Sequence, residues 1–396
     1  MPETEQMVIQ GETAPRFERV REAFATNFAA HREVGAAIAV YVDGQPVVDL
    51  WGGRMHPDDD APWERDTLVN CWSMTKGMTA ICVHMLADRG LLDYDAPVAQ
   101  YWPEFAKLGK EAIPVRWLLS HQAGLVAVDP ALQPREHEQW DTIIHALEET
   151  TPQWVPGTKN GYHMVTFGWL VGEVVRRITG ISVGTFFRDE VAGPLGVSDF
   201  YIGTPASEDG RIASILLPVP NAIGVPNPDL DAPVNQLTVR SLMHDSELLG
   251  DPNSRGWRGA EIPGANGHGN ARAVARIYSA LAEGGELDGV RLMSPERVAI
   301  ARAIQVDSVD EVLTIRTRRS LGFMHPVPGT GDRRGMQSFG HSGAGGSMGW
   351  ADPEHRIGFA YTMSQMWTGP FGTLDPRAQS LAGAVYESLG IETGAA

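Results

Sequence analysis

Ser73-Met74-Thr75-Lys76 is the stretch on which the fold assignment depends, because it places a hydroxyl and an amine one helical turn apart. Residues i and i+3 of a helix share a face, so the two side chains can meet. A serine hydroxyl is a weak nucleophile until a base takes its proton, and a desolvated lysine can act as that base. The apolar run 77–83 continues the helix, and free N–H groups at its start, near Ser73, favour negative charge.

The composition argues against a chance match of this motif. The chain has four lysines, and only Lys76 has a serine three residues before it. With serine at its ordinary frequency, about 0.2 such matches are expected by chance. The other basic side chains are arginines, which stay protonated and cannot act as bases. Ser73 and Lys76 are therefore predicted to be a catalytic pair, with a chance match as the alternative.

Length and charge exclude several classes of protein. The chain has 396 residues, 43% of them hydrophobic, and 11 tryptophans, which suffices for one large domain or two ordinary ones. The formal net charge is −17, whereas nucleic acids and anionic membrane surfaces attract basic patches. We therefore expect neither nucleic acid nor a membrane as a partner, and we leave a homo-oligomer open.

Cysteine usage and the N-terminus bear on the compartment. Cys71 and Cys82 would lie about 16 Å apart along one helix, too far for a disulfide. Residues 1–6 show no basic and apolar leader, and no apolar run reaches the roughly 18 residues of a membrane span. Free thiols suit a reducing compartment, so the sequence predicts a cytoplasmic protein.

Strand patterns occur near both ends of the chain, and the middle is mainly helical. Asp43-Gly44 between two apolar runs is a strong hairpin signal, and a helix followed by a hairpin argues against a doubly wound parallel sheet. We expect an α+β fold (an α/β sandwich), with one antiparallel sheet built from both chain ends, flanked by helices, and an inserted helical domain. The sheet domain is expected at 1–72 and 285–396, and the insertion at 73–284. The predicted elements are helices 15–33, 73–89, 168–178, 271–281 and 376–389, a short helix from Ser294-Pro295, and strands 36–42, 46–51, 340–350 and 357–363.

The segment 215–266 interrupts this pattern with seven prolines. Long loops without secondary structure are usually functional in compact domains. We predict an ordered irregular loop over a cleft, with a surface loop without function as the alternative.

A second serine motif competes with the first. Gly345-Gly346-Ser347-Met348-Gly349 matches G-x-S-x-G, in which the serine stands between a strand and a helix. Here Asp352-Pro353 follows, the next segment is strand-like, and no histidine follows His355, so we reject Ser347 as nucleophile. The histidines lack close ligand pairs, and the glycine-rich stretch 343–346 precedes no helix, so neither a metal nor a cofactor is predicted.

Several motifs occur in an order that is typical of one family. The chain resembles the serine β-lactamase and penicillin-binding-protein superfamily, and it is most similar to the class C-like carboxylesterases (family VIII esterases). The resemblance spans most of the chain, and each motif is weak alone but specific in this order. The motifs are Ser73–Lys76, Trp154–Tyr162 running into Gly168–Glu173, and Phe339–Gly346, with Leu118–Leu125 and Gly267–Arg272 as further similar segments.

The resemblance implies roles at the matching positions. Ser73 would be the acylated nucleophile, Lys76 its base partner and Tyr162 a proton relay, although Tyr162 could instead be a packed aromatic residue. The N–H groups of Ser73 and Ala344 would form the oxyanion hole, worth about 3–4 kcal/mol per donor. The substrate-binding residues would be Gln122, His341, Ser342 and Gly343. For His341 a role in satisfying strand-edge groups stays open, and His121 is predicted to be a structural hydrogen-bonding residue.

The chain departs from the family pattern in two places. The second motif is Tyr162-His163-Met164, without the asparagine usual in the lactamases, and the third has His341 where lysine is usual. That lysine helps to hold the carboxylate of penicillin, whereas neutral esters need no such anchor. The leading hypothesis is therefore a serine esterase for short-chain or aromatic carboxylic esters, acting through an acyl-serine. The alternatives are an acyltransferase, a weak β-lactamase, or a silent homologue that binds a ligand or assembles with partners.

Overall fold

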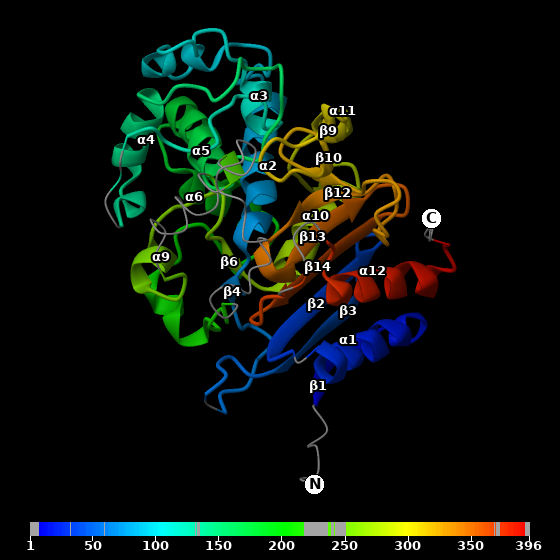
Figure 1. The fold of residues 1–396 in the computed structure, drawn as a ribbon. Coiled ribbons are helices and arrows are strands. Elements are labelled where there is room, and N and C mark those ends of the chain that lie inside the picture. The colour runs from blue at the N-terminus through cyan, green and yellow to red at the C-terminus, as the bar shows by residue number, and fades with distance from the viewer. Residues whose placement is uncertain are drawn as a thin grey trace.

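A nine-stranded antiparallel sheet forms the centre of the computed structural model of this protein (Figure 1). The structure describes residues 8–31, 33–58, 60–130, 132, 135–217, 237–238, 241, 251–367, 369 and 373–392. The strand order is β1-β3-β2-β14-β13-β12-β11-β10-β9, so the strands of both chain ends meet where β2 pairs with β14. The strands are β1 (Ile9–Thr13), β2 (Gly35–Val42), β3 (Gln45–Gly53), β9 (Val306–Val309), β10 (Arg316–Arg319), β11 (Met324–His325), β12 (Phe339–Ser342), β13 (Met348–Asp352) and β14 (Ile357–Met363).

Helices cover both faces of this sheet. On one face α1 (Glu18–His31) and α12 (Pro376–Leu389) pack side by side, and on the other α10 (Ala271–Ala282) packs against β14 and β2 (Figure 1). Strand β2 is buried on both sides, because its alternate side chains enter two separate apolar clusters. The prediction of an α+β fold with a sheet assembled from both chain ends is therefore confirmed.

The other helices lie beyond the face that α10 covers. Helix α2 (Thr75–Asp88) is buried all round and contacts α5, α6, α11 and β12, which makes it the centre of this part of the molecule. The other elements are α3 (Val115–Leu119), α4 (Trp140–Glu148), α5 (Thr166–Thr179), α6 (Val183–Phe186), α9 (Arg255–Gly259) and α11 (Pro295–Arg302), the three-stranded sheet β4 (Val69–Asn70), β6 (His268–Gly269) and β5 (Phe200–Tyr201), the pair β7 (Glu286–Leu287) and β8 (Val290–Arg291), the π-turn η6 (Phe187–Ala192), and the 3₁₀ turns η1 (Pro15–Phe17), η2 (Trp72–Met74), η3 (Val98–Gln100), η4 (Pro103–Phe105), η5 (Glu136–Glu138), η7 (Ala206–Arg211) and η9 (Ala344–Gly346).

Two predicted elements need correction. Residues 340–350 are not one strand but the two strands β12 and β13, joined by the turn η9, in which Gly345 takes a φ of 76°. The helix expected to start at Ser73 begins at Thr75, because the preceding residues form the tighter turn η2. The strands β1 and β9–β11 were not predicted. Most of the loop predicted at 215–266 lies outside the described residues, and its described part contains the helix α9.

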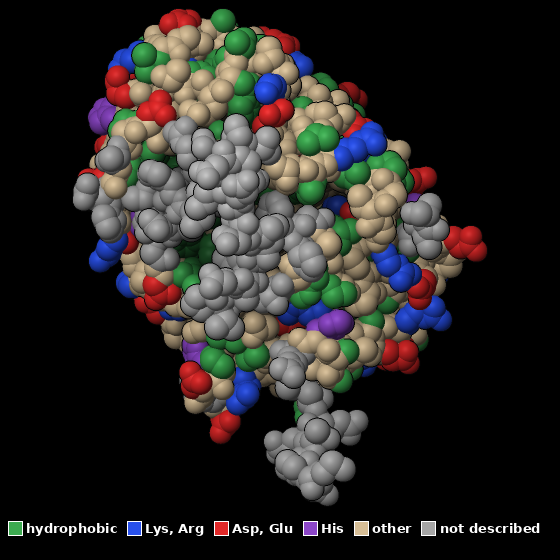
Figure 2. Space-filling model, viewed as in Figure 1, with side chains coloured by type: hydrophobic (Ala, Val, Ile, Leu, Met, Phe, Trp, Pro, Cys, Tyr) green, Lys and Arg blue, Asp and Glu red, His purple; other side chains and the backbone are tan. Residues whose placement is uncertain are grey.

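The domain division at 73 and 284 stays a prediction. Helix α10 falls inside the expected insertion by sequence, yet it packs against the sheet. Within the described residues, no helix has the length and apolar character needed to cross a membrane. On the face shown in Figure 2, acidic and basic side chains are interspersed, so this face shows no single-sign field despite the net charge of −17.

Candidate active site

Ser73 stands in a tight turn that the local sequence holds between β4 and α2. Trp72, just before it, has a φ of 49°, a strained value for a bulky residue, and its N–H donates to Asn70 Oδ1 at 3.2 Å. Thr75 Oγ1 donates to the Trp72 carbonyl at 2.5 Å and accepts from Gly267 N–H at 2.9 Å. Ser73 is partly exposed. The turn therefore presents its hydroxyl in a fixed orientation ahead of the helix.

Lys76 is fully buried and lies next to Ser73. Its Nζ is 3.0 Å from Ser73 Oγ, 2.5 Å from the Met164 carbonyl oxygen and 2.7 Å from the Gly264 carbonyl oxygen. Burial and the positive charge of Arg319 both lower the pKa of Lys76 well below its usual range. Since carbonyl oxygens only accept, a neutral amine gives its two N–H groups to them and keeps its lone pair for the Ser73 hydroxyl.

Tyr162 forms the second wall of the site. Lys76 Nζ lies 4.9 Å from the centroid of the Tyr162 ring, and the ring also faces His341 at 6.1 Å. Burial raises the pKa of Tyr162 to about 12, although an interaction with the Ser73 side chain acts in the opposite direction. The phenol is therefore protonated at neutral pH and can serve as a donor, while the neutral amine beside it can accept.

The end of β12 forms the third wall and approaches the Ser73 turn closely. A Cβ built on Gly343 would lie 2.3 Å from the Cys71 carbonyl oxygen, so only glycine fits here. Ala344 is the first residue of η9 and Ser73 lies in the first turn of η2, positions where backbone N–H groups have no acceptor within the turn. Ser342 is partly buried and is the last residue of β12, directly before Gly343. Both predicted oxyanion-hole donors thus stand in turns that meet at Gly343.

His341 is neutral, and one nitrogen of its ring is a buried acceptor. Its Nδ1 lies 2.7 Å from the Ser342 carbonyl oxygen and must donate to it, which leaves Nε2 as an acceptor. Nε2 is buried and has no hydrogen-bond partner among the described residues. Burial is the main cause that lowers the pKa of His341 well below its usual range. Position 341, where the serine β-lactamases usually have lysine, therefore carries no positive charge in this protein.

His121 has the structural role that was predicted for it. Its Nδ1 accepts from His163 N–H at 3.0 Å, and burial lowers its pKa well below the usual range. Gln122 donates to Ser120 Oγ at 3.1 Å, and its carbonyl accepts from Gly157 N–H at 3.0 Å. These bonds tie Gln122 to its own loop, and its role in substrate binding stays a prediction.

The structure places an arginine next to Tyr162 that the sequence did not reveal as part of the site. Arg319, on β10, is buried and ion-paired with Asp310, and its Cζ lies 5.2 Å from the Tyr162 ring centroid. The sequence of β10 is Arg316-Thr317-Arg318-Arg319, and three arginines in four residues do not predict a strand. The one available signal was the alternation of side chains between the two faces of a strand. In β10, Thr317 and Arg319 are buried, whereas Arg316 is exposed.

Ser347 is a structural serine. It is fully buried, donates to the Cys71 carbonyl at 2.9 Å, and leads into the strand β13 instead of a helix. Within the described residues, one group could offer three metal ligands, namely Asp352, Glu354 and His355. It stands at the opposite end of β13 from Ser347, and Asp352 Oδ2 already accepts from Tyr386 and His355.

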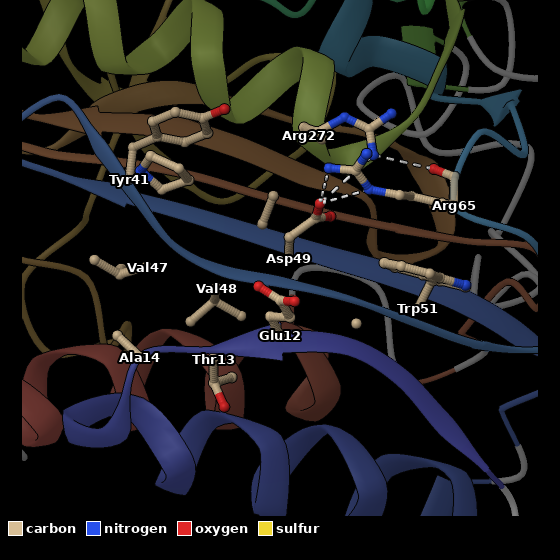
Figure 3. A pocket seen from close by; sticks show the side chains of 13 residues that line it. Glu12, Thr13, Ala14, Tyr41, Val47, Val48, Asp49, Trp51, Arg65 and Arg272 are labelled. Atoms are coloured by element: carbon tan, nitrogen blue, oxygen red, sulfur yellow. Dashed lines mark hydrogen bonds and ion pairs between the residues drawn. The ribbon is translucent and has the colours of Figure 1, made fainter.

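A separate hollow of about 820 Å³ lies beside β1 and β3 (Figure 3). Tyr41 and Trp51 line it together with Asp49, which pairs with Arg65 at 2.8 Å and with Arg272 at 3.6 Å. Its lining includes no residue of the Ser73 site.

We expect Gly343→Ala to lower kcat/KM for a p-nitrophenyl ester by about 100-fold, because an added methyl must push β12 away from the Ser73 turn, and a displacement of about 1 Å at a reacting group can have that effect. Gly210→Ala is the matched control, since a Cβ there meets no atom within 4 Å. Steady-state kinetics on the two variants check this. Equal activity in both would show that the approach of Gly343 to Cys71 does not matter.

Comparison with known proteins identifies the family of this chain. The sequence matches the family described as Beta-lactamase over residues 20–384. It is 40% identical over 368 residues to Esterase/beta-lactamase LipL from Mycobacterium tuberculosis, covering 90% of this chain and 83% of that protein. The fold is similar to a crystal structure of a family VIII carboxylesterase (43% identity, TM-score 0.86, 96% of this chain and 100% of the other). It is also similar to a penicillin-binding protein homologue from Caulobacter crescentus (37% identity, TM-score 0.87, with the same coverage). The chain therefore belongs to the beta-lactamase family, among its esterase/β-lactamase-like hydrolases.

Proposed function

We propose that this protein is a serine carboxylesterase that hydrolyses short-chain or aromatic carboxylic esters through an acyl-Ser73 intermediate. The observation that carries the proposal is the contact between Lys76 Nζ and Ser73 Oγ at 3.0 Å, in a buried site where two carbonyls occupy the N–H groups of the amine. The similarity to LipL and to a family VIII carboxylesterase supports it.

In the first step the neutral Lys76 amine takes the proton of Ser73, and Ser73 Oγ attacks the ester carbonyl carbon. The carbonyl oxygen becomes an oxyanion, for which the N–H groups of Ser73 and Ala344 are the proposed donors, each worth about 3–4 kcal/mol. Lys76 is a better candidate for the base than Tyr162, since burial lowers the pKa of the amine and raises that of the phenol.

In the second step the bond between the carbonyl carbon and the alcohol oxygen breaks, and the alcohol must leave with a proton. We assign its delivery to Tyr162, whose ring centroid lies 4.9 Å from Lys76 Nζ and whose phenol can pass on the proton that Lys76 received. Water then attacks the acyl-Ser73 carbonyl carbon, and Lys76 takes the proton of the water. The bond between the carbonyl carbon and Ser73 Oγ breaks, Ser73 Oγ takes the proton back from Lys76, and the carboxylic acid leaves. No cofactor or metal is needed for this sequence.

His341 favours esters over β-lactams as substrates. Its ring is neutral, so it supplies no positive charge to hold a carboxylate where a lysine would attract one. Arg319 does not replace the missing charge on the substrate side, because it is buried and paired with Asp310. Weak β-lactamase activity is the second candidate, and the family match and the similarity to LipL favour it.

Two free thiols, Cys71 and Cys82, are both buried. We retain the reducing, cytoplasmic compartment as a proposal on that basis.

Intact-mass spectrometry tests the proposal. The protein is exposed briefly to p-nitrophenyl acetate, p-nitrophenyl butyrate, a β-lactam and a fluorophosphonate, and the modified peptide is then identified. We expect a mass increase equal to the acyl or phosphonyl group, located on Ser73, and faster turnover of the esters than of the β-lactam. Product analysis with an added alcohol distinguishes hydrolysis from acyl transfer. If Ser73 stays unmodified by the fluorophosphonate and neither ester is turned over, the proposal is wrong.

A further inference from the structure

We propose that the buried Asp310–Arg319 ion pair of the β9–β10 hairpin is a positioning device for the reaction, which fixes Tyr162 against Lys76 and places a permanent positive charge beside the amine. This inference rests on the proposed function, in which Lys76 accepts the Ser73 proton. Asp310 and Arg319 contact the segment that carries Tyr162, and we assign them an action on the reaction through Tyr162 and Lys76.

The β9–β10 hairpin holds the segment that carries Tyr162. Asp310 Oδ1 accepts from the N–H of Tyr162 at 3.1 Å, and also from Val312 and Leu313 of its own loop. Two residues before Tyr162, Asn160 donates to Ser308 Oγ at 2.7 Å. The Asn160 carbonyl accepts from Glu311 N–H at 2.9 Å. The edge hairpin of the sheet thus sets the position of the phenol relative to α2.

Arg319 completes this contact from the other strand of the hairpin. It pairs with Asp310 Oδ2 and donates to Asn160 Oδ1 at 3.1 Å. Its Cζ lies 5.2 Å from the centroid of the Tyr162 ring, and Lys76 Nζ lies 4.9 Å from the same centroid. A cation is attracted to an aromatic ring at such a distance, so the Arg319 guanidinium is held against the phenol, and the Lys76 amine lies against the same ring.

The pair has features that stability alone does not explain. Arg319 is 1% exposed, yet its Nε and Nη2 have no hydrogen-bond partner among the described residues. Burying a charged group with unsatisfied donors is costly, and well-packed apolar residues in place of a buried ion pair are often as stable or more so. An electrostatic role beside Lys76 accounts for a charge at this position.

Arg319 is also the fixed positive charge that acts on Lys76. The buried histidines around the amine stay neutral, because burial lowers the pKa of His163 to about 4 and the pKa of His121 and of His341 well below the usual range. Burial is the larger cause of the lowered pKa of Lys76, and the charge of Arg319 is the second. Within the described part of the chain, the titratable and charged side chains that interact with Lys76 are His121, Tyr162, His163, Arg319 and His341, and Asp310 stands behind them as the partner of Arg319.

The pH dependence of Ser73 labelling tests the inference. Removing the positive charge should raise the pKa of Lys76, so that more of the amine is protonated at a given pH. The acid limb, which is the low-pH side of the pH–rate profile where the rate falls as Lys76 takes up a proton, should therefore move to higher pH. We expect Arg319→Gln to shift this limb of the fluorophosphonate labelling rate, and of kcat/KM for p-nitrophenyl butyrate, by about one pH unit or more. Arg319→Lys keeps the charge and should leave the limb near its original pH. The double variant Asp310→Asn/Arg319→Gln should show the shifted limb without a buried unpaired charge.

Arg334→Gln is the matched control, because Arg334 forms a similarly buried pair with Asp332 at 2.6 Å but does not contact Tyr162. It should leave the acid limb unmoved. If Arg319→Gln and the double variant lower the rate equally at every pH, with the limb in place, Arg319 is merely structural and the inference is wrong. That result leaves the proposed function intact, whereas an unmodified Ser73 in the unaltered protein overturns the proposed function itself.

Discussion

Ser73→Ala is expected to lower ester turnover by about 10⁴-fold or more, because loss of a nucleophile removes the covalent route and leaves only binding and oxyanion stabilisation. The Ser73 hydroxyl is the one hydroxyl in contact with Lys76 Nζ among the described residues. Hydrolysis of p-nitrophenyl butyrate, together with covalent labelling by a fluorophosphonate, measures the effect. Both signals should disappear while the melting temperature changes little, since the side chain is partly exposed.

Ser347→Ala is the matched control for this experiment. Ser347 belongs to the competing G-x-S-x-G motif, but its hydroxyl is buried and donates to a backbone carbonyl. The variant should lose about 1 kcal/mol of stability and keep its activity within about tenfold. Loss of labelling in Ser347→Ala together with retained labelling in Ser73→Ala would contradict the assignment of the nucleophile.

Lys76→Met should lower kcat/KM by roughly 10²–10⁴-fold, the range typical of a general base. Methionine is similar in length and can occupy the buried channel, but it cannot take a proton. The acid limb in the unaltered protein should lie well below the usual pKa of lysine, because burial and Arg319 lower the pKa of Lys76. The remaining kcat/KM of Lys76→Met should no longer fall at low pH in the way that the kcat/KM of the unaltered protein does. A pH–rate profile of both proteins measures this.

Lys110→Met separates the chemical role of Lys76 from the effect of removing a buried lysine. Lys110 is also buried, and its Nζ donates to two backbone carbonyls, those of Glu148 at 2.9 Å and Thr150 at 2.6 Å. It has no serine beside it. We expect this variant to lose stability and to retain most of its kcat/KM. Comparable loss of activity in the two variants would indicate that Lys76 supports the fold and not the reaction.

Local signals in the sequence predicted much of the fold. Asn270 caps α10, Ser294 caps α11, and Pro376 opens α12 at the predicted residue, because a cap acts on backbone groups only a few residues away. The hairpin of β2 and β3 followed from Asp43-Gly44 in the same way. The strands β9–β11 were missed because they are short, and β10 consists mainly of arginines, whose strand conformation depends on neighbours far along the chain.

The spacing of Ser73 and Lys76 was sufficient to predict their contact, because a helical turn brings residues three apart together whatever surrounds them. What the amine can do depends instead on segments from three other parts of the chain. The carbonyls of Met164 and Gly264 occupy its N–H groups, and Arg319 supplies positive charge, from 88 to 243 residues away. The amino-acid sequence alone therefore determined which two groups meet, and only the tertiary structure decided their protonation, because burial and long-range charge set a pKa and neither is a local property of the chain.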